Sequence, residues 1–233
     1  MMFTSRRAAP WLIGLCLCMG PGLASAQPAR AVQEKPGVAD ELFSAAMRDD
    51  VSALRTLLLR GADPNVRDKD GNTPLYVALR EPALAVAAQL IEYRATQVDA
   101  RNKTDETPLM MASLRGQLDM VKKLIERGAD VNKTGWTPLH YAATRSHDEI
   151  VNLLLEEHAY IDAESPNGTT PLMMAAQYGG DSTVKLLLDA GADPSLRNRL
   201  GLSAADFAHR AKREQVAELI AAQMRKKQPK GQW

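Results

Sequence analysis

The apolar residues of this chain recur at the spacing of amphipathic helices, and three of these runs are followed by the same short phrase. Residues three and four positions apart share one face of a helix, so a run of this kind predicts a helix that buries one side. The phrase Gly-Ala-Asp follows these runs at 61–63, 128–130 and 191–193. Two of the runs are Leu54, Leu57 and Leu58, and Val184, Leu187 and Leu188.

A second phrase, Thr-Pro-Leu, recurs out of phase with the first. Its threonines are 34, 30 and 33 residues apart, and a worn copy, Ser203-Ala204-Ala205, follows 33 residues after the last. The four full copies stand at 73–75, 107–109, 137–139 and 170–172. A fixed period of about 33 residues indicates a solenoid built from repeated supersecondary units.

Each residue type in the two phrases suits its position in the repeat for a physical reason. Threonine is a good N-cap, because its side-chain oxygen accepts a backbone N–H that has no partner inside the helix. Proline suits the first helical position, where its missing N–H is not needed. The leucine then points into the stack, and small residues such as Ala112, Ala142 and Ala175 allow close helix packing. Glycine closes the second helix in a left-handed conformation.

These phrases resemble the ankyrin repeat, and the resemblance runs from about Asp40 to Met224. It implies an all-α fold: an ankyrin-repeat solenoid of about six helix-turn-helix units with short β-hairpin-like fingers between them. One unit cannot bury its own apolar face, so stability comes from stacking. We expect an N-terminal cap at 40–67 and a C-terminal cap at 198–224. Four fuller repeats lie between them, at 68–101, 102–133, 134–164 and 165–197.

Three departures from the pattern predict local irregularities. The spacing of 30 removes residues between Asn132 and Gly135, so that finger is expected to be short. Arg94 and His158 replace the closing glycine, which predicts a mildly strained non-glycine residue at positive φ. Pro82 replaces the glycine expected between the two helices of the second unit. That unit is the one expected to deviate most.

The N-terminal segment reads as a secretory signal peptide at 1–26. Arg6 and Arg7 precede an apolar run that is too short to span a membrane, and Ala24-Ser25-Ala26 forms a small-x-small cleavage site. Both cysteines of the chain leave with this segment, so we expect no disulfide and no thiolate chemistry. We expect a flexible leader at 27–39, a basic tail at 225–233, and export to a bacterial periplasm.

Composition and charge exclude several functions. The 233 residues carry 29 Lys and Arg against 28 Asp and Glu, and loss of Arg6 and Arg7 reverses this to 27 against 28. A near-neutral balance argues against charge-driven nucleic-acid binding. The apolar share of 45% excludes disorder of the whole chain. We also expect no stable membrane insertion after cleavage, and a monomer.

Catalytic and metal-binding patterns are missing from the sequence. The histidines, His140, His147, His158 and His209, lack the spacing of a helical metal pair, and no glycine-rich phosphate loop or nucleophile elbow is found. We therefore predict no enzyme, no metal and no cofactor. The resemblance assigns His140 a structural part, tying helix starts together. Met110-Met111 and Met173-Met174 are expected to fill the core, with a haem or redox contact as the alternative.

A binding surface is what remains. Proteins with ankyrin repeats usually meet partners through finger tips and the exposed side of the first helices, and this rule selects twelve residues. Trp, Tyr and Arg, which are common at interface hot spots, are among them, and Arg80, Arg115 and Arg145 would form a stripe suited to an acidic protein. The alternative is an ordinary surface with no common partner. The predicted residues are Asn72, Arg80, Glu81, Glu106, Leu114, Arg115, Trp136, Thr144, Arg145, Thr169, Gln177 and Tyr178.

The sequence therefore predicts a non-catalytic protein-binding module in the periplasm, of the scaffold, inhibitor or immunity type. One alternative is a periplasmic oxidative-stress protein that supports a catalase or binds haem. A weaker alternative is an effector directed at a host cell. The partner itself does not follow from the fold, because solenoids of one kind host many functions.

Overall fold

The computed structural model describes residues 37–227, which fold into twelve helices arranged as six pairs. The predicted all-α solenoid is confirmed for this part of the chain. The helices are α1 Val38–Arg48, α2 Val51–Leu59, α3 Pro74–Arg80, α4 Leu84–Glu92, α5 Pro108–Leu114, α6 Leu118–Glu126, α7 Pro138–Arg145, α8 Asp148–Glu156, α9 Pro171–Tyr178, α10 Asp181–Asp189, α11 Ala204–Arg210 and α12 Glu214–Lys227.

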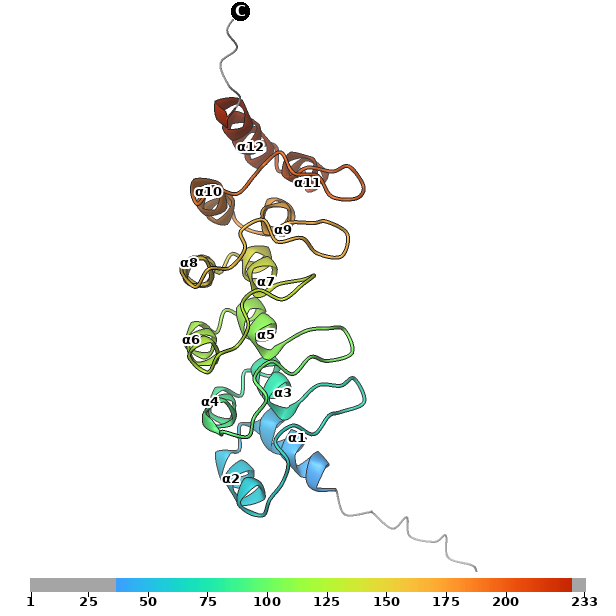
Figure 1. Ribbon diagram of the computed structural model, residues 1–233, viewed down its shortest axis with the longest axis vertical. Helices are drawn as coiled ribbons and strands as arrows, with labels where there is room; N and C mark the ends of the chain where they lie inside the picture. Colours follow the sequence, from blue (N-terminus) through green and yellow to red (C-terminus); the bar gives the residue numbers. More distant parts are fainter. Residues whose placement is uncertain (1–36, 228–233) are drawn as a thin grey trace, which may run out of the picture. The chain divides into compact units, whose positions relative to one another are not determined.

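The odd-numbered helices form one column of the stack and most of the even-numbered helices form a second column beside it (Figure 1). Loops project from the side of the odd-numbered column as a row of fingers. Within the stack, α7 packs between α5 and α9. The first helices therefore lie between the second helices and the fingers, and their free side faces the same way as the fingers.

The predicted threonine caps are confirmed at α3, α5 and α9, whereas the side chain of Thr137 makes no cap hydrogen bond at α7. The hydroxyl oxygens of Thr73, Thr107 and Thr170 accept the backbone N–H three residues on, at 3.3, 3.3 and 3.4 Å. In the worn copy, Ser203 does the same for Asp206 at 3.3 Å. A proline follows each of the four threonines at the start of the helix. These caps satisfy donors that are buried between neighbouring repeats.

The core runs through the whole stack. The leucines of the four Thr-Pro-Leu phrases, Leu75, Leu109, Leu139 and Leu172, are at most 1% exposed. Burial of one leucine side chain stabilises a fold by about 2 kcal/mol. Ala112, Ala142, Ala143, Ala175 and Ala176 are fully buried, and their small side chains let adjacent first helices approach closely, as predicted.

The ends of the second helices follow the prediction with one exception. Gly61, Gly128 and Gly191 have φ of 85°, 86° and 105°, and His158 takes the same left-handed conformation at φ 63°. The prediction for Arg94 was wrong, because Tyr93, the residue after α4, leaves the helix in an extended conformation with φ −72° and ψ 117°, and Arg94 is not at positive φ. Leaving the helix through an extended residue removes the need for positive φ at Arg94.

The fingers at 68–72, 102–106, 165–169 and 198–202 are each closed by a backbone hydrogen bond between their first and last residues. The side chain of the first residue also accepts backbone N–H groups inside the finger, as Asn198 Oδ1 does from Leu200 and Leu202 at 3.0 Å. The finger before α7 is shorter, as predicted (Figure 1). It begins at Lys133, which donates from Nζ to the carbonyl oxygens of Thr134 and Trp136 at 3.0 and 3.3 Å.

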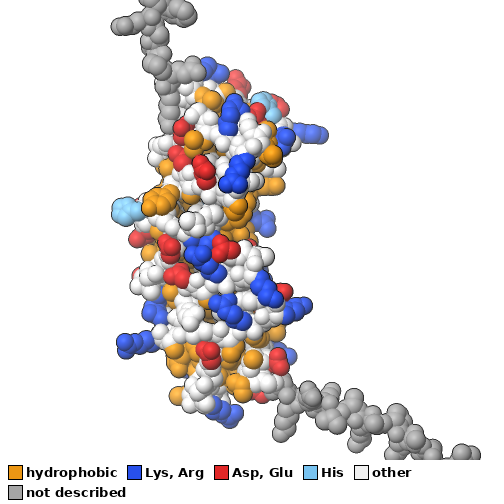
Figure 2. All heavy atoms as spheres, turned by 45° about the vertical axis from the view of Figure 1, so that its right-hand side comes forward, with side chains coloured by type: hydrophobic (Ala, Val, Ile, Leu, Met, Phe, Trp, Pro, Cys, Tyr) orange, Lys and Arg blue, Asp and Glu red, His pale blue; other side chains and the backbone are white. Residues whose placement is uncertain are grey.

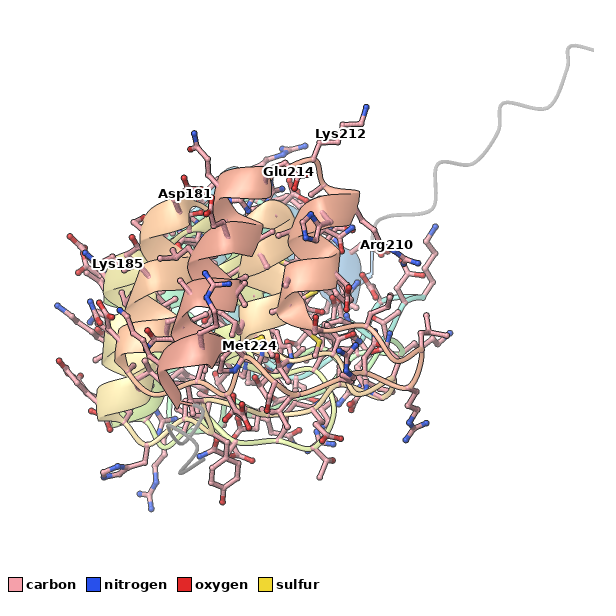
Figure 3. The ribbon with its side chains drawn as sticks, turned by 90° about the horizontal axis from the view of Figure 1, so that it is seen from above. Asp181, Lys185, Arg210, Lys212, Glu214 and Met224 are labelled. Carbon is pink, nitrogen blue, oxygen red and sulfur yellow. The ribbon has the colours of Figure 1, made fainter. Side chains whose placement is uncertain are left out.

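The ends of the stack carry polar side chains. α1 begins at Val38, before the expected start of the cap, and Gly37 N–H donates to the Asp40 carboxylate at 3.2 Å. At the other end, Lys185, Arg210 and Lys212 point away from the helices (Figure 3). α12 extends to Lys227, into the expected tail. The predicted signal peptide, residues 27–36 of the leader and residues 228–233 of the tail lie outside the described residues.

No helix within residues 37–227 is long and apolar enough to cross a membrane.

The turn between the two helices holds a residue at positive φ in five of the six pairs, and the exception is the turn before α10, where Gly179 has φ −80°. Asp49, Gly116, Ser146 and Lys212 occupy the positive-φ position with φ of 56°, 70°, 60° and 59°. Pro82 stands at the same place with φ 23°, whereas a proline ring favours about −65°. The predicted irregularity of the second unit is thus a proline in a turn that disfavours it.

Pro82→Gly is expected to raise the free energy of unfolding by about 1 kcal/mol. Relief of a strained backbone residue is worth on the order of 1–3 kcal/mol, and the greater freedom of glycine in the unfolded chain offsets part of it. Urea titration followed by circular dichroism measures the change. Ser146→Pro, which places proline in the same turn two repeats later, should lower stability. A less stable Pro82→Gly variant would contradict this account of the turn.

Candidate functional site

The twelve residues predicted to contact a partner fall into three groups by exposure. Glu81, Arg115, Arg145 and Tyr178 are exposed, and Asn72 and Thr169 are buried. The other six are partly exposed: Arg80, Glu106, Leu114, Trp136, Thr144 and Gln177. They follow the free side of α3, α5, α7 and α9 and the last residue of each preceding finger. Figure 2 shows hydrophobic side chains scattered among basic and acidic ones on the side where the fingers project.

Asn72 and Thr169 serve the fingers rather than the surface. Asn72 donates from Nδ2 to Asp68 at 2.9 Å and accepts from Asn102 Nδ2 at 3.0 Å. The carbonyl oxygen of Thr169 lies 2.9 Å from His140 Nε2, and its N–H donates to Ser165 Oγ at 3.0 Å. Both side chains are less than 5% exposed, so the expectation of exposed contact side chains at these two positions was wrong.

Glu106 is the centre of a hydrogen-bond network that joins three repeats. Its carboxylate accepts from the hydroxyl groups of Tyr76 and Tyr141 at 2.6 and 2.8 Å. Asn102 and Thr104 donate to the same carboxylate, both at 3.1 Å. Burial alone would raise the pKa of Glu106, but these four donors outweigh it and hold the pKa below its ordinary value. Glu106 therefore stays ionised and fixes the ring of Tyr141.

An apolar groove of about 210 Å³ lies between α5, α7 and α9, and we call it the Trp136 groove. Trp136 meets His140 edge to face, with ring centroids 5.1 Å apart and planes at 76°. Three of its residues, Leu114, Trp136 and Thr144, belong to the predicted set. The lining is Leu114, Trp136, His140, Tyr141, Thr144 and Met174.

A second hollow, of about 620 Å³, adjoins the Trp136 groove through Leu114, which lines both. We call it the arginine hollow, because Arg115 and Arg145 line it beside Pro82, Leu84, Gln117 and His147. Neither arginine forms an ion pair with another described residue. Arg80, by contrast, pairs with Glu81 at 2.8 Å. The predicted stripe of three arginines therefore offers two unpaired positive charges.

Tyr141 and Met174 line the groove but do not belong to the predicted contact set. Each stands four residues after the threonine of its repeat, one step along the helix from the buried residue at the third position. This offset alone does not identify a surface position, because Val77 and Met111 share it and are buried. Tyr178 is 60% exposed but does not line the groove. Met174 is the residue of α9 that lines it.

Met110, Met173 and His147 are engaged in contacts within the stack, whereas His158 and His209 are exposed. The sulfur atoms of Met110 and Met173 each accept the N–H of the capping threonine at 3.4 Å, and both side chains are at most 1% exposed. His147 Nε2 lies 3.2 Å from the carbonyl oxygen of Leu114. Between residues 37 and 227, no three His, Cys, Asp or Glu side chains are placed to hold a metal ion together.

The structural part predicted for His140 is confirmed. Its Nδ1 accepts the N–H of Thr137 at 3.1 Å, and its Nε2 lies 2.9 Å from the carbonyl oxygen of Thr169 in the next repeat. The neutral ring with its proton on Nε2 satisfies both partners. Burial lowers the pKa of His140 to about 4, although the carbonyl oxygen of Thr169 favours the charged form.

Comparison with known proteins gives one family. The model described as ankyrin repeats (3 copies) matches residues 42–134 and 132–198. Over 89 residues, 38% of this chain, it is 39% identical to alpha-latrocrustotoxin-Lt1a of Latrodectus tredecimguttatus. It is 38% identical to NF-kappa-B inhibitor alpha of Sus scrofa, and 43% identical to neurogenic locus notch homolog protein 4 of Homo sapiens, over 39% and 34% of this chain. The matched stretches span 6%, 31% and 4% of these relatives.

A solved structure matches a larger share of the chain. It is the complex of a predatory endopeptidase with an immunity protein from Bdellovibrio bacteriovorus. The match has a TM-score of 0.69 and 26% sequence identity, and it covers 78% of this chain and 97% of the matched chain.

The stability of the fold should depend on pH through His140. The folded pKa of about 4 lies below the value of about 6.5 in the unfolded chain, so only the unfolded state gains the proton between these values. The free energy of unfolding should be steady above about pH 6.5 and fall by about 3 kcal/mol on the way to pH 4. Urea titrations between pH 4 and 7.5 measure this. His140→Gln should be less stable at pH 7 but show a flatter dependence. Equal slopes for the two proteins would contradict the assignment.

Proposed function

The chain belongs to the ankyrin repeat family, and we propose that it is a non-catalytic module that binds a partner protein. The observation that carries the proposal is the Trp136 groove with the adjoining arginine hollow. Both open on the free side of the first helices, and each is built by residues from three consecutive repeats. An apolar hollow bordered by polar and charged side chains is typical of a protein interaction site.

The residue types also favour protein binding. Trp136 and Tyr141 offer large rigid rings, and a tryptophan or arginine at the centre of an interface often contributes most of the binding energy. The apolar lining supplies contact area, and the unpaired guanidinium groups of Arg115 and Arg145 favour an acidic protein. Partner contacts at Gln177 and Tyr178, farther along α9, remain part of the proposed surface.

The proposed mode of action is occupation of another protein, as an inhibitor, an immunity protein or a scaffold. The similar solved structure contains an immunity protein together with an endopeptidase, which supports the first two of these. A rigid stack suits this task, because little conformational entropy is lost when a preorganised surface binds.

We propose the bacterial periplasm as the place of action, on the basis of the signal-like segment at 1–26. The mature protein should then begin at Gln27. Mass spectrometry of the protein from osmotic-shock and cytoplasmic fractions measures both the location and the first residue. Ala24→Leu with Ala26→Leu should block cleavage, because the peptidase requires small residues there. Recovery of the intact chain in the osmotic-shock fraction of wild-type cells would overturn the proposal.

Capture of a partner tests the proposed surface. Trp136→Ala and, separately, Arg145→Gln should each weaken retention of the partner at least about tenfold, the usual effect of removing a hot-spot side chain. The measurement is quantitative mass spectrometry of proteins retained by the tagged protein from extracts of cells that produce it.

Tyr160→Ala is the matched control, since Tyr160 is an exposed aromatic residue after α8 and is not part of either hollow. The control should retain the partner as well as wild type does. Equal retention by all variants would place the interface elsewhere, and no protein retained by wild type would contradict the proposal for that cell.

A further inference from the structure

The row of fingers has a notch at the finger before α7. The fingers on either side, 102–106 and 165–169, are closed by backbone hydrogen bonds, Asn102 N–H to Glu106 O at 3.1 Å and Ser165 N–H to Thr169 O at 3.0 Å. The finger between them consists only of the residues from Lys133 to Trp136, which are followed by the capping Thr137. The shortened loop is visible in Figure 1. A partner chain that crosses the row of fingers meets the least obstruction at this place.

Lys133 holds the short finger in shape. The regular fingers use a side-chain oxygen at their first position, which accepts N–H groups, whereas Lys133 donates to the carbonyl oxygens of Thr134 and Trp136. Its ammonium group also pairs with Asp105 of the preceding finger, and its side chain is 2% exposed. The notch is therefore a built feature, and Trp136 is fixed at its inner edge.

The Trp136 groove lies directly behind this notch. Trp136 is the last residue of the short finger, and the same groove is lined farther along the first helices by Leu114, Thr144 and Met174. A large apolar side chain that enters past the finger would contact an indole ring, a phenol ring and three aliphatic or thioether groups. Burial of such a side chain removes apolar surface from water and so favours binding.

The charges at the two ends of the surface have opposite signs. At the finger end, the ionised carboxylate of Glu106 lies beside the groove, because it accepts the hydroxyl group of Tyr141. At the far end, Arg115 and Arg145 line the arginine hollow without an ion pair among the described residues. A carboxylate of a bound segment is therefore repelled by Glu106 at the finger end and attracted by Arg115 and Arg145 at the far end.

We propose that the partner supplies an extended segment with one large apolar residue for the Trp136 groove and one acidic residue, three or four positions away, for the arginine hollow. This inference rests on the proposed function and names the chemistry of the partner. The length of α7 from its cap at Thr137 to Arg145 corresponds to about 12 Å at 1.5 Å per residue. An extended chain advances about 3.3 Å per residue, so three to four residues cover this distance.

Selection from a random dodecapeptide phage library tests the proposal, with protein purified from cells that express the full chain. The peptides enriched by wild type should share Leu, Met, Phe or Trp and, three or four positions away, Asp or Glu. In the best synthetic peptide, replacement of the acidic residue by its amide should weaken binding about tenfold, as expected for loss of a charge-assisted hydrogen bond. Fluorescence anisotropy of the labelled peptide measures this change.

Charge reversal separates recognition from a general effect on folding. The Arg115→Glu and Arg145→Glu double variant should select Lys or Arg where wild type selects an acid, and should keep the apolar preference. Trp136→Ala should lose the apolar preference instead. The control is Arg60→Glu with Arg94→Glu, which makes the same change in net charge at exposed residues outside both hollows and should select the wild-type peptides.

Peptides without an acidic residue, identical selections by wild type and the reversed variant, or no enrichment above the Trp136→Ala variant would each overturn the inference. Its failure is distinguishable from failure of the proposed function. If the capture experiment gives a protein that depends on Trp136 while the library shows no acidic residue, the binding function stands and the partner chemistry is wrong. If capture also gives no protein that depends on Trp136, both are wrong.

Discussion

The stack depends on a single constraint: the N-terminus of each first helix is buried between its neighbours, where water cannot supply hydrogen bonds to the free N–H groups. The hydroxyl oxygen of a threonine or serine meets this need at the starts of α3, α5, α9 and α11, whereas at α7 the backbone carbonyl oxygen of Thr137 accepts the N–H of His140. His140 extends the solution to the next repeat, because it accepts from Thr137 on one side and reaches the carbonyl oxygen of Thr169 on the other. Met110 and Met173 take the same position with a weaker sulfur acceptor.

The features that repeat were predictable from the sequence, because each is decided within a few residues. The caps and the closing glycines follow from local chemistry, as at Thr73 and Gly128, and the short finger follows from the spacing of 30 between Thr107 and Thr137. Contacts across repeats were not predictable in the same way. Glu106 meets Tyr76 and Tyr141, which are 30 and 35 residues away, and such a meeting depends on the exact rise and rotation between units. For this reason Asn72 and Thr169 were predicted to lie at the surface, whereas the structure shows that both are buried.

The candidate surface coincides with the place where the repeat is least regular. The finger that begins at Lys133 is shorter than its neighbours, and its first residue donates where the others accept. A regular stack presents a nearly uniform row of fingers, which gives a partner no unique register. A local irregularity removes that degeneracy, because only one position along the row admits a chain to the apolar groove behind it. In the proposed binding mode, backbone geometry therefore sets the position of the partner segment along the stack, and side chains then select its sequence.

Electrostatics then gives the surface a direction. Glu106 stays ionised although it is half-buried, since four donors hold its pKa down, and Arg115 and Arg145 lie toward the opposite ends of their helices. Fixed charges of opposite sign at the two ends of an apolar groove favour one orientation of a bound segment over its reverse. The donors that hold Glu106 belong to three repeats, so this polarity is coupled to the integrity of the stack. Loosening of one repeat would weaken both the groove wall at Tyr141 and the charge that orients the partner.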